Sequence, residues 1–252
     1  MLKWLCAHGY TSNLNTAAAA AETGRGQGCP WDSSTCSAAA SACQWDILKW
    51  AWSEGCPWDK GTCSEAARSG HLEMLQWLRG QGCPLDRGTC SAAAGGGHLE
   101  VLQWLRGQGC PWDESMYRSA AGNDHLEVLK WARGQGLYLG SGIGVSAARG
   151  GHFEVLKWLA SQGYNFHEEE DCYSTAASNG DLVMLQWLRD QRCPLNRVQI
   201  CPRAIKSGHL DVLKWAVSQG CPLLGQYYST AADYGHLEMA QWLRRAVPYS
   251  DT

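Results

Sequence analysis

The chain has 252 residues, of which 45% are apolar, and its 14 tryptophans against 2 phenylalanines provide material for a sizeable core. Lys and Arg total 21 and Asp and Glu total 24, and this net charge of −3 excludes a dedicated binder of nucleic acid or of an anionic membrane. The sequence has no apolar run of 18 residues and no export signal, and its 13 cysteines are odd in number, so we expect a soluble intracellular, cytoplasmic protein with reduced thiols.

The N-terminal residues 1–33 form an irregular repeat fragment, because "AAETG" runs directly into "RGQGC" without an intervening second helix. We expect this to mark a fragment or an imperfect gene product. From residue 34 onwards, one tryptophan recurs in a constant frame every 27 to 29 residues. This tryptophan ladder comprises Trp50, Trp77, Trp104, Trp131, Trp158, Trp187, Trp215 and Trp242. The predicted repeats are 34–60, 61–87, 88–114, 115–141, 142–170, 171–198, 199–225 and 226–252.

Each repeat is predicted to contain two helices, as the second repeat illustrates. The first helix is short and rich in alanine, with Thr62 as its N-cap and Glu65 completing a capping box. Gly70 ends that helix, because glycine tolerates the left-handed conformation. The second helix begins near residue 71, carries an apolar stripe, and ends at "GQGCP", where Gly82 supplies the cap and Pro84 prevents continuation. Neighbouring repeats must stack to cover such a stripe.

The frame "AARSGHLEMLQWLRGQGC" resembles the ankyrin repeat. The matching positions are Ala66, Ala67, Gly70, His71, Leu72, Glu73, Leu75, Leu78 and Gly82. The resemblance implies an all-α fold over residues 34–252, an ankyrin-like α-solenoid of stacked helix-turn-helix repeats. The sequence departs from the family in being Trp-rich, and in a period of 27 rather than about 33 residues. The missing residues are those of the β-hairpin finger, so no sheet is expected.

Histidines occupy one column at the turn between the two helices of a repeat. A catalytic base or metal ligand would not recur once per repeat, so we interpret these side chains as hydrogen bonders that stabilise the turn. The column contains His71, His98, His125, His152, His209 and His236, and Asp181 occupies the position in another repeat.

Cysteines occupy two further columns. The loop column holds Cys29, Cys56, Cys83, Cys110, Cys193 and Cys221, and the first-helix column holds Cys36, Cys63, Cys90 and Cys201. Leu137 and Tyr164 replace cysteine in the former, and Tyr117, Tyr173 and Tyr228 in the latter, which indicates packing groups. Equivalent cysteines of stacked repeats would lie about 8 to 10 Å apart, too far for a disulfide ladder. A metal or redox role stays open as the alternative.

The tryptophan ladder is predicted to be structural, on the buried stripe of the second helices. A second apolar column lies in the loops and is interpreted as partly buried against the neighbouring repeat, with an exposed row of partner-binding side chains as the alternative. It comprises Trp31, Trp58, Leu85, Trp112, Leu139, Phe166, Leu195 and Leu223. The acidic run "EEED" at 168–171 is interpreted as a solvated bulge, with a metal site as the alternative.

The predicted function is a non-catalytic protein–protein interaction scaffold that binds an unknown partner protein through first-helix and short-loop surface. The sequence has no nucleophile elbow and no phosphate-binding loop, so we expect no enzyme, no cofactor, no bound metal and no small-molecule substrate. The alternative is a thiol-based metal-binding or redox protein that uses the repeated cysteines. Outward first-helix positions vary on the constant frame and are the predicted partner-binding residues: Glu65, Arg68, Arg118, Arg149, Arg203, Lys206 and Asp233.

Overall fold

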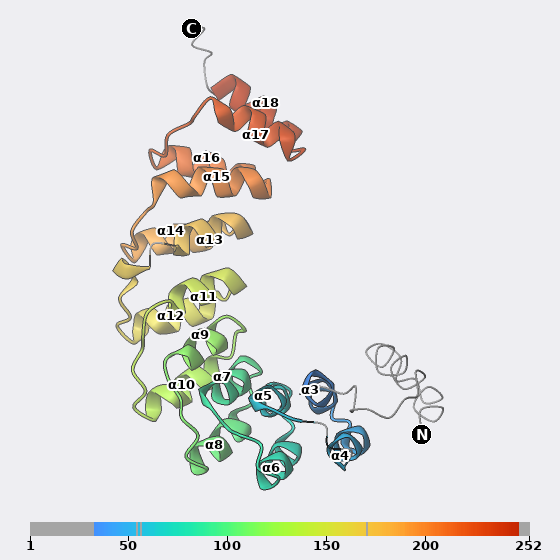
Figure 1. The fold of residues 1–252 in the computed structure, drawn as a ribbon. Helices are drawn as coiled ribbons and strands as arrows, with labels where there is room; N and C mark the ends of the chain where they lie inside the picture. Colours follow the sequence, from blue (N-terminus) through green and yellow to red (C-terminus); the bar gives the residue numbers. More distant parts are fainter. Residues whose placement is uncertain (1–32, 54, 56, 170, 247–252) are drawn as a thin grey trace, which may run out of the picture. The chain divides into compact units, whose positions relative to one another are not determined.

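The computed structural model describes residues 33–246 except 54, 56 and 170 (Figure 1). The chain divides into two compact units, Met1–Ala120 and Ala121–Thr252, so the division falls within the predicted repeat 115–141. The predicted N-terminal fragment lies outside the described residues apart from Ser33, and so does the side chain of Trp50. All regular structure in the described residues is helical, and none of it is strand, which confirms the all-α prediction for that part of the chain.

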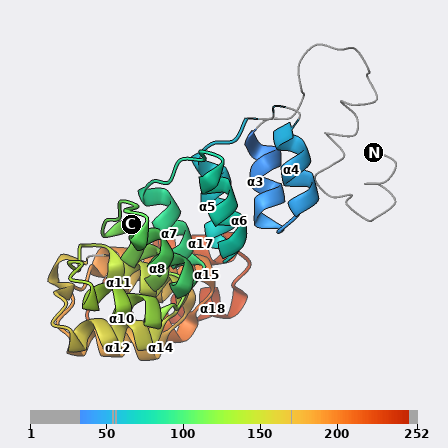
Figure 2. The same ribbon diagram turned by 90° about the horizontal axis from the view of Figure 1, so that it is seen from below.

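The first unit is a series of short helices in which alternate helices pack on one another. Its elements are α3 (Ser33–Ser41), α4 (Trp45–Ser53), α5 (Lys60–Arg68), α6 (Leu72–Gly80), α7 (Arg87–Gly95), α8 (Leu99–Gly107) and α9 (Ser115–Ala121), which ends at the boundary. Helix α5 contacts α3 and α7, and α3, α5 and α7 each contact the helix that follows them (Figure 2).

The second unit follows the same pattern. Its elements are α10 (Leu126–Gly134), α11 (Ile143–Gly150), α12 (Phe153–Ser161), the 3₁₀ helix η1 (Phe166–Glu168), α13 (Cys172–Asn179), α14 (Leu182–Asp190), α15 (Arg197–Ser207), α16 (Leu210–Ser218), α17 (Gln226–Asp233) and α18 (Leu237–Ala246). Helices α11, α13, α15 and α17 contact one another in order, and each contacts its following helix. Among the described residues, no helix is long and apolar enough to cross a membrane.

The first helices α5 and α7 each begin at an aspartate, and α5 does not begin at the predicted threonine. Asp59 is the N-cap of α5, and its carboxylate accepts hydrogen bonds from the amides of Gly61 at 2.8 Å and Thr62 at 3.3 Å. The prediction that Thr62 caps this helix is therefore wrong, because Thr62 lies inside the first turn and is fully buried. Asp86 plays the same part for α7, in a capping box with Thr89. The predicted left-handed glycines are confirmed at Gly70 (φ 77°) and Gly82 (φ 85°).

The core consists of small first-helix residues and the aliphatic stripe of the second helices. Ala66 and Ala67 of α5, and Met74, Leu75 and Leu78 of α6, are fully buried. The described indoles of the tryptophan ladder, in contrast, are only half-buried, so the prediction that they lie on the buried stripe is corrected. They flank the aliphatic stripe because the apolar arc of these helices is wider than the strip that the neighbouring helices cover.

The ladder makes its contacts with the preceding repeat. The ring of Trp77 meets Trp45 at 5.9 Å and Trp58 at 5.5 Å, in edge-to-face geometry. In the second unit, Trp187 meets Phe153 at 5.4 Å and Phe166 at 5.7 Å in the same way. Of the two loop-column partners, Trp58 is half-buried and Phe166 is buried. The other described residues of the loop column are half-buried, which confirms the predicted partial burial of this column.

Histidines of the turn column also reach into the preceding repeat. The Nε2 atom of His71 lies 3.1 Å from the carbonyl oxygen of Ser41, and His209 lies 3.1 Å from that of Ser178. His152 and His236 make the equivalent bonds at 3.2 Å. The interpretation of these histidines as hydrogen bonders is confirmed at these four positions, with the addition that each bond joins two repeats.

Candidate functional site

The predicted partner-binding residues lie on the first helices, but only some of them are brought together. In the first unit, Glu65 and Arg68 form an ion pair with each other at 3.5 Å across one turn of α5, and Arg118 is exposed on α9. In the second unit, the exposed residues are Arg149 of α11, Arg203 and Lys206 of α15, and Asp233 at the end of α17.

Arg149 and Arg203 border a groove of about 250 Å³ that runs across α13 between α11 and α15. We call it the first-helix groove, and it is lined by Arg149, Asp171, Ser174, Thr175, Ser178, Asn179 and Arg203. Lys206 and Asp233 are not part of its lining. The polar floor was not predicted from the sequence, although the run "DCYSTAASN" carries a signal in its hydroxyl and amide side chains on a helix that is otherwise buried.

The floor of the groove is held in place by hydrogen bonds. The hydroxyls of Ser174 and Thr175 donate to the carbonyl oxygen of Asp171 at 3.0 and 2.7 Å, and Ser178 donates to that of Ser174 at 3.0 Å. The amide nitrogen of Asn179 donates to the carbonyl oxygen of Arg149 at 3.1 Å, which joins α13 to α11. The groove therefore has a fixed polar surface without a ligand.

The two arginine side chains differ from the floor in their contacts. Neither guanidinium forms an ion pair with any carboxylate of the described residues. A guanidinium presents five donors in a planar fork that matches a carboxylate. Asp171 is the one acidic side chain in the lining, so the groove is basic overall and also offers an acceptor.

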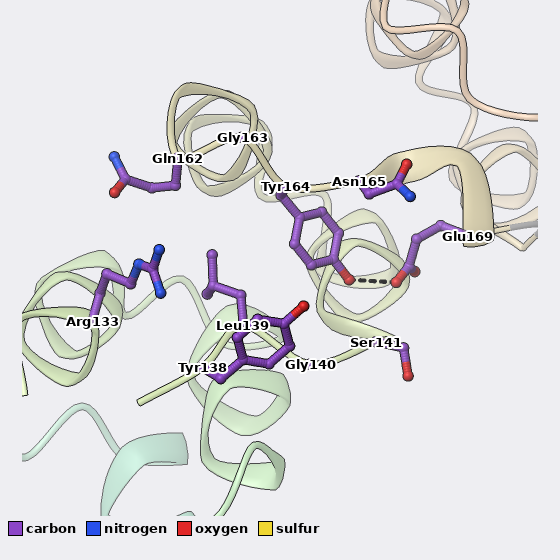
Figure 3. A pocket seen from close by; sticks show the side chains of 10 residues that line it. All are labelled: Arg133, Tyr138, Leu139, Gly140, Ser141, Gln162, Gly163, Tyr164, Asn165 and Glu169. Atoms are coloured by element: carbon purple, nitrogen blue, oxygen red, sulfur yellow. Dashed lines mark hydrogen bonds between the residues drawn. The ribbon is translucent and has the colours of Figure 1, made fainter. Parts of the chain in front are cut away.

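A second hollow, of about 400 Å³, lies beside the N-terminus of α11 (Figure 3). Its wall includes Glu169, whose side chain is 3% exposed and accepts hydrogen bonds from the backbone amides of Gly142 at 2.6 Å and Val145 at 3.0 Å. The hydroxyl of Tyr164 donates to the same carboxylate (Figure 3). Burial of the phenol, together with this carboxylate, raises the pKa of Tyr164.

The interpretation of the acidic run as a solvated bulge is therefore wrong for Glu169, which is buried, whereas Asp171 of the same run is exposed. Gly140 stands where the second repeat has the capping residue Asp59, so α11 lacks a local N-cap carboxylate. Glu169 supplies that carboxylate from the following loop. Backbone amides and the Tyr164 phenol bind both oxygens of this carboxylate. We therefore interpret Glu169, which lines the hollow in Figure 3, as the helix cap of α11.

The described thiols of both cysteine columns are buried, as predicted, and all of them are free thiols. Tyr117 and Tyr173 are buried in the first-helix column, whereas Tyr228 is 39% exposed and does not follow the predicted burial. Cys43, which belongs to neither column, is exposed. Within the part of the chain that the structure describes, no group of three or more His, Cys, Asp or Glu side chains is arranged to hold a metal ion.

The first-helix groove is accordingly the candidate site, since it joins two predicted arginines to a polar floor in one hollow. The hydroxyls of its floor are held in fixed positions. In comparisons with known proteins, no protein-family model and no curated protein matches this chain.

Proposed function

We propose that the chain is a non-catalytic protein–protein interaction scaffold whose ankyrin-like repeats stack into an α-solenoid. The ordered contacts of α3, α5 and α7, and of α11, α13, α15 and α17, support the stacking, because repeats of a solenoid touch only their neighbours. The observation that carries the functional proposal is the first-helix groove. There Arg149 and Arg203 flank a polar floor and form no ion pair with a carboxylate of the described residues.

The partner is a protein segment that carries carboxylates. Two guanidiniums that pair with none of the described carboxylates are complementary to acidic side chains, and bidentate pairing fixes the orientation of the bound segment. The hydroxyls of Thr175 and Ser178 border the same hollow and can bond to the peptide backbone of that segment, while Asp171 repels a segment whose charge is misplaced. Binding of this kind weakens as ionic strength rises.

The test combines partner identification with charge reversal in the groove. Proximity labelling with the full chain in its native cells identifies candidate partners, and the affinity of each purified candidate is then measured by calorimetry. We expect Arg149→Glu with Arg203→Glu to weaken the specific complex at least about tenfold, which corresponds to about 1.4 kcal/mol of binding free energy.

A matched control carries the same charge change on second helices of the same unit. Lys130→Glu with Lys157→Glu alters two exposed residues of α10 and α12, and binding is expected to change by less than about twofold if affinity depends on local contacts. Far-UV circular dichroism verifies that both double variants fold. Equal binding by the groove variant and the wild type would contradict the proposal.

A further inference from the structure

The loop that follows α10 lacks two side chains that the equivalent loop of the preceding repeat carries. Residues 110–113 read "CPWD", whereas the equivalent residues 137–140 read "LYLG". Leu139 therefore takes the place of Trp112, and Gly140 stands where the preceding repeat has an aspartate. This loop has lost an indole ring and a carboxylate at adjacent positions.

The arginine that would cover the missing ring lies beside an open space instead. In the preceding repeat, the guanidinium carbon of Arg106 lies 4.1 Å from the centroid of the Trp112 ring, which is a cation–π contact. Arg133 is the equivalent residue of α10, and it lines the hollow of about 400 Å³ together with Leu139 (Figure 3). With the residues that the structure describes, its guanidinium forms neither an ion pair nor a cation–π contact.

Two tyrosines form further parts of the wall of this hollow. The ring of Tyr164 is held in place by its hydroxyl, which donates to Glu169, and by an edge-to-face contact with Phe166 at 5.1 Å. Tyr138 is largely exposed and lines the same hollow. A cavity of roughly 150 Å³ is enough to bind benzene, so this hollow has room for an indole or a phenol ring. Its wall thus combines a cation, aromatic rings and an aliphatic side chain, which together suit an aromatic guest.

We propose that this hollow receives an aromatic side chain, tryptophan or tyrosine, from a segment of the partner protein. The proposal rests on the proposed function, because it assumes that the chain binds a partner. The incoming ring takes the place that Trp112 holds in the preceding repeat. It packs against Leu139, and the guanidinium of Arg133 lies over its face.

The hollow lies next to the first-helix groove along the chain. Glu169 lines the hollow and Asp171 lines the groove. Two residues that are two positions apart have Cα atoms within about 7.6 Å of each other. One partner segment can therefore place a carboxylate in the groove and an aromatic ring in the hollow.

The test uses the full chain and single blocked amino acids, so it does not depend on the identity of the partner. A fluorinated N-acetyltryptophanamide is titrated with the chain and followed by fluorine NMR, and unlabelled compounds then compete with it. We expect N-acetyltryptophanamide and N-acetyltyrosinamide to displace it in the millimolar range and N-acetylleucinamide to displace it much less. Free L-tryptophan should compete no better than the blocked amide, because a residue within a protein chain has no charged amino group.

Two substitutions locate the binding at the hollow. Leu139→Trp restores the indole of the loop column and is expected to weaken binding of the amide at least about tenfold, because the chain's own ring fills the space. Arg133→Met keeps the length of the side chain without its charge and is expected to weaken binding about threefold. The matched controls are Leu85→Trp and Arg106→Met, whose guanidinium lies over the chain's own Trp112, and both should leave the affinity unchanged. Far-UV circular dichroism verifies that the four variants fold.

The proposal is overturned if no aromatic amide binds, if the leucine amide competes equally, or if Leu139→Trp and Leu85→Trp bind the amide equally well. Tighter binding of free tryptophan than of the amide would identify a small-molecule site and would also overturn it, as would a partner complex that Leu139→Trp does not weaken. Charge reversal at Arg149 and Arg203 is a separate test of the proposed function, because neither residue lines the hollow.

Discussion

At the scale of single residues, Glu169 shows how a distant side chain replaces a missing local signal. The helix α11 begins after Gly142, which has no side chain to cap it, and the Glu169 carboxylate accepts from the amides of Gly142 and Val145. Replacing the carboxylate leaves two amides and the Tyr164 hydroxyl without their acceptor. We therefore expect Glu169→Ala to lower the free energy of unfolding by about 1–3 kcal/mol, measured by urea denaturation.

The control for this change is another glutamate of the same unit. Glu154 is exposed, and its carboxylate pairs with Lys157 at 2.8 Å on the surface of α12. Such a pair contributes little, so Glu154→Ala should cost less than about 0.5 kcal/mol. Equal losses in the two variants would show that the buried carboxylate does not stabilise α11.

The sequence could not predict this cap, because it depends on which loop lies over the start of α11. For the described cysteines, in contrast, column membership predicts burial correctly, because it follows from the repeat pattern itself. Sequence variation on a constant frame predicted that Arg149 and Arg203 are exposed. It could not predict that they border one groove, because the groove depends on how α11, α13 and α15 are spaced.

At the scale of helices, α13 shows how the bond between repeats is kept when the turn histidine is absent. Asp181 occupies the histidine column and caps its own helix, accepting from Met184 at 2.8 Å. The amide of Asn179 instead donates to the carbonyl oxygens of Ala148 at 3.0 Å and Arg149 at 3.1 Å. Because this side chain supplies the donor in place of the histidine, we expect Asn179→Ala to lower the free energy of unfolding by about 0.5–1.5 kcal/mol in urea denaturation.

Ser207 provides the matched position, since it ends α15 as Asn179 ends α13. The next repeat retains its donor in His236, which bonds to the carbonyl oxygen of Lys206 at 3.2 Å. Ser207→Ala should therefore be nearly neutral. If both alanine variants lose the same stability, Asn179 does not substitute for the histidine.

Helix existence was predictable because periodicity and glycine stops act locally. The second helices carry their aliphatic stripe and end before a left-handed residue such as Gly82, and both signals lie within one repeat. The degree to which each tryptophan is buried was not predictable from signals within one repeat. Trp77 belongs to the apolar arc of α6 but lies at its edge, where Trp45 and Trp58 cover only part of the indole.

At the scale of the whole molecule, each described helix has few neighbours, and this governs how stability is distributed. The period of the sequence predicts one continuous array over 34–252, whereas the described contacts gather into two compact units. Periodicity indicates which residues are equivalent, but the strength of contact between particular repeats depends on individual side chains. A single free energy of unfolding is well defined only if all repeats unfold together, and an array of neighbour contacts does not guarantee this.

A core substitution in α14 tests how far its effect spreads. Leu185 is fully buried in this helix, whereas Val183 is 64% exposed and gives a control in the same element. We expect Leu185→Ala to cost about 2–5 kcal/mol and Val183→Ala less than about 0.5 kcal/mol. Because α14 contacts α13 and α16, hydrogen exchange should accelerate in these three helices at urea concentrations where α17 and α18 remain protected. Uniform acceleration throughout Ala121–Thr252 would show instead that this unit unfolds as one cooperative block, with coupling between repeats stronger than the stability of any one of them.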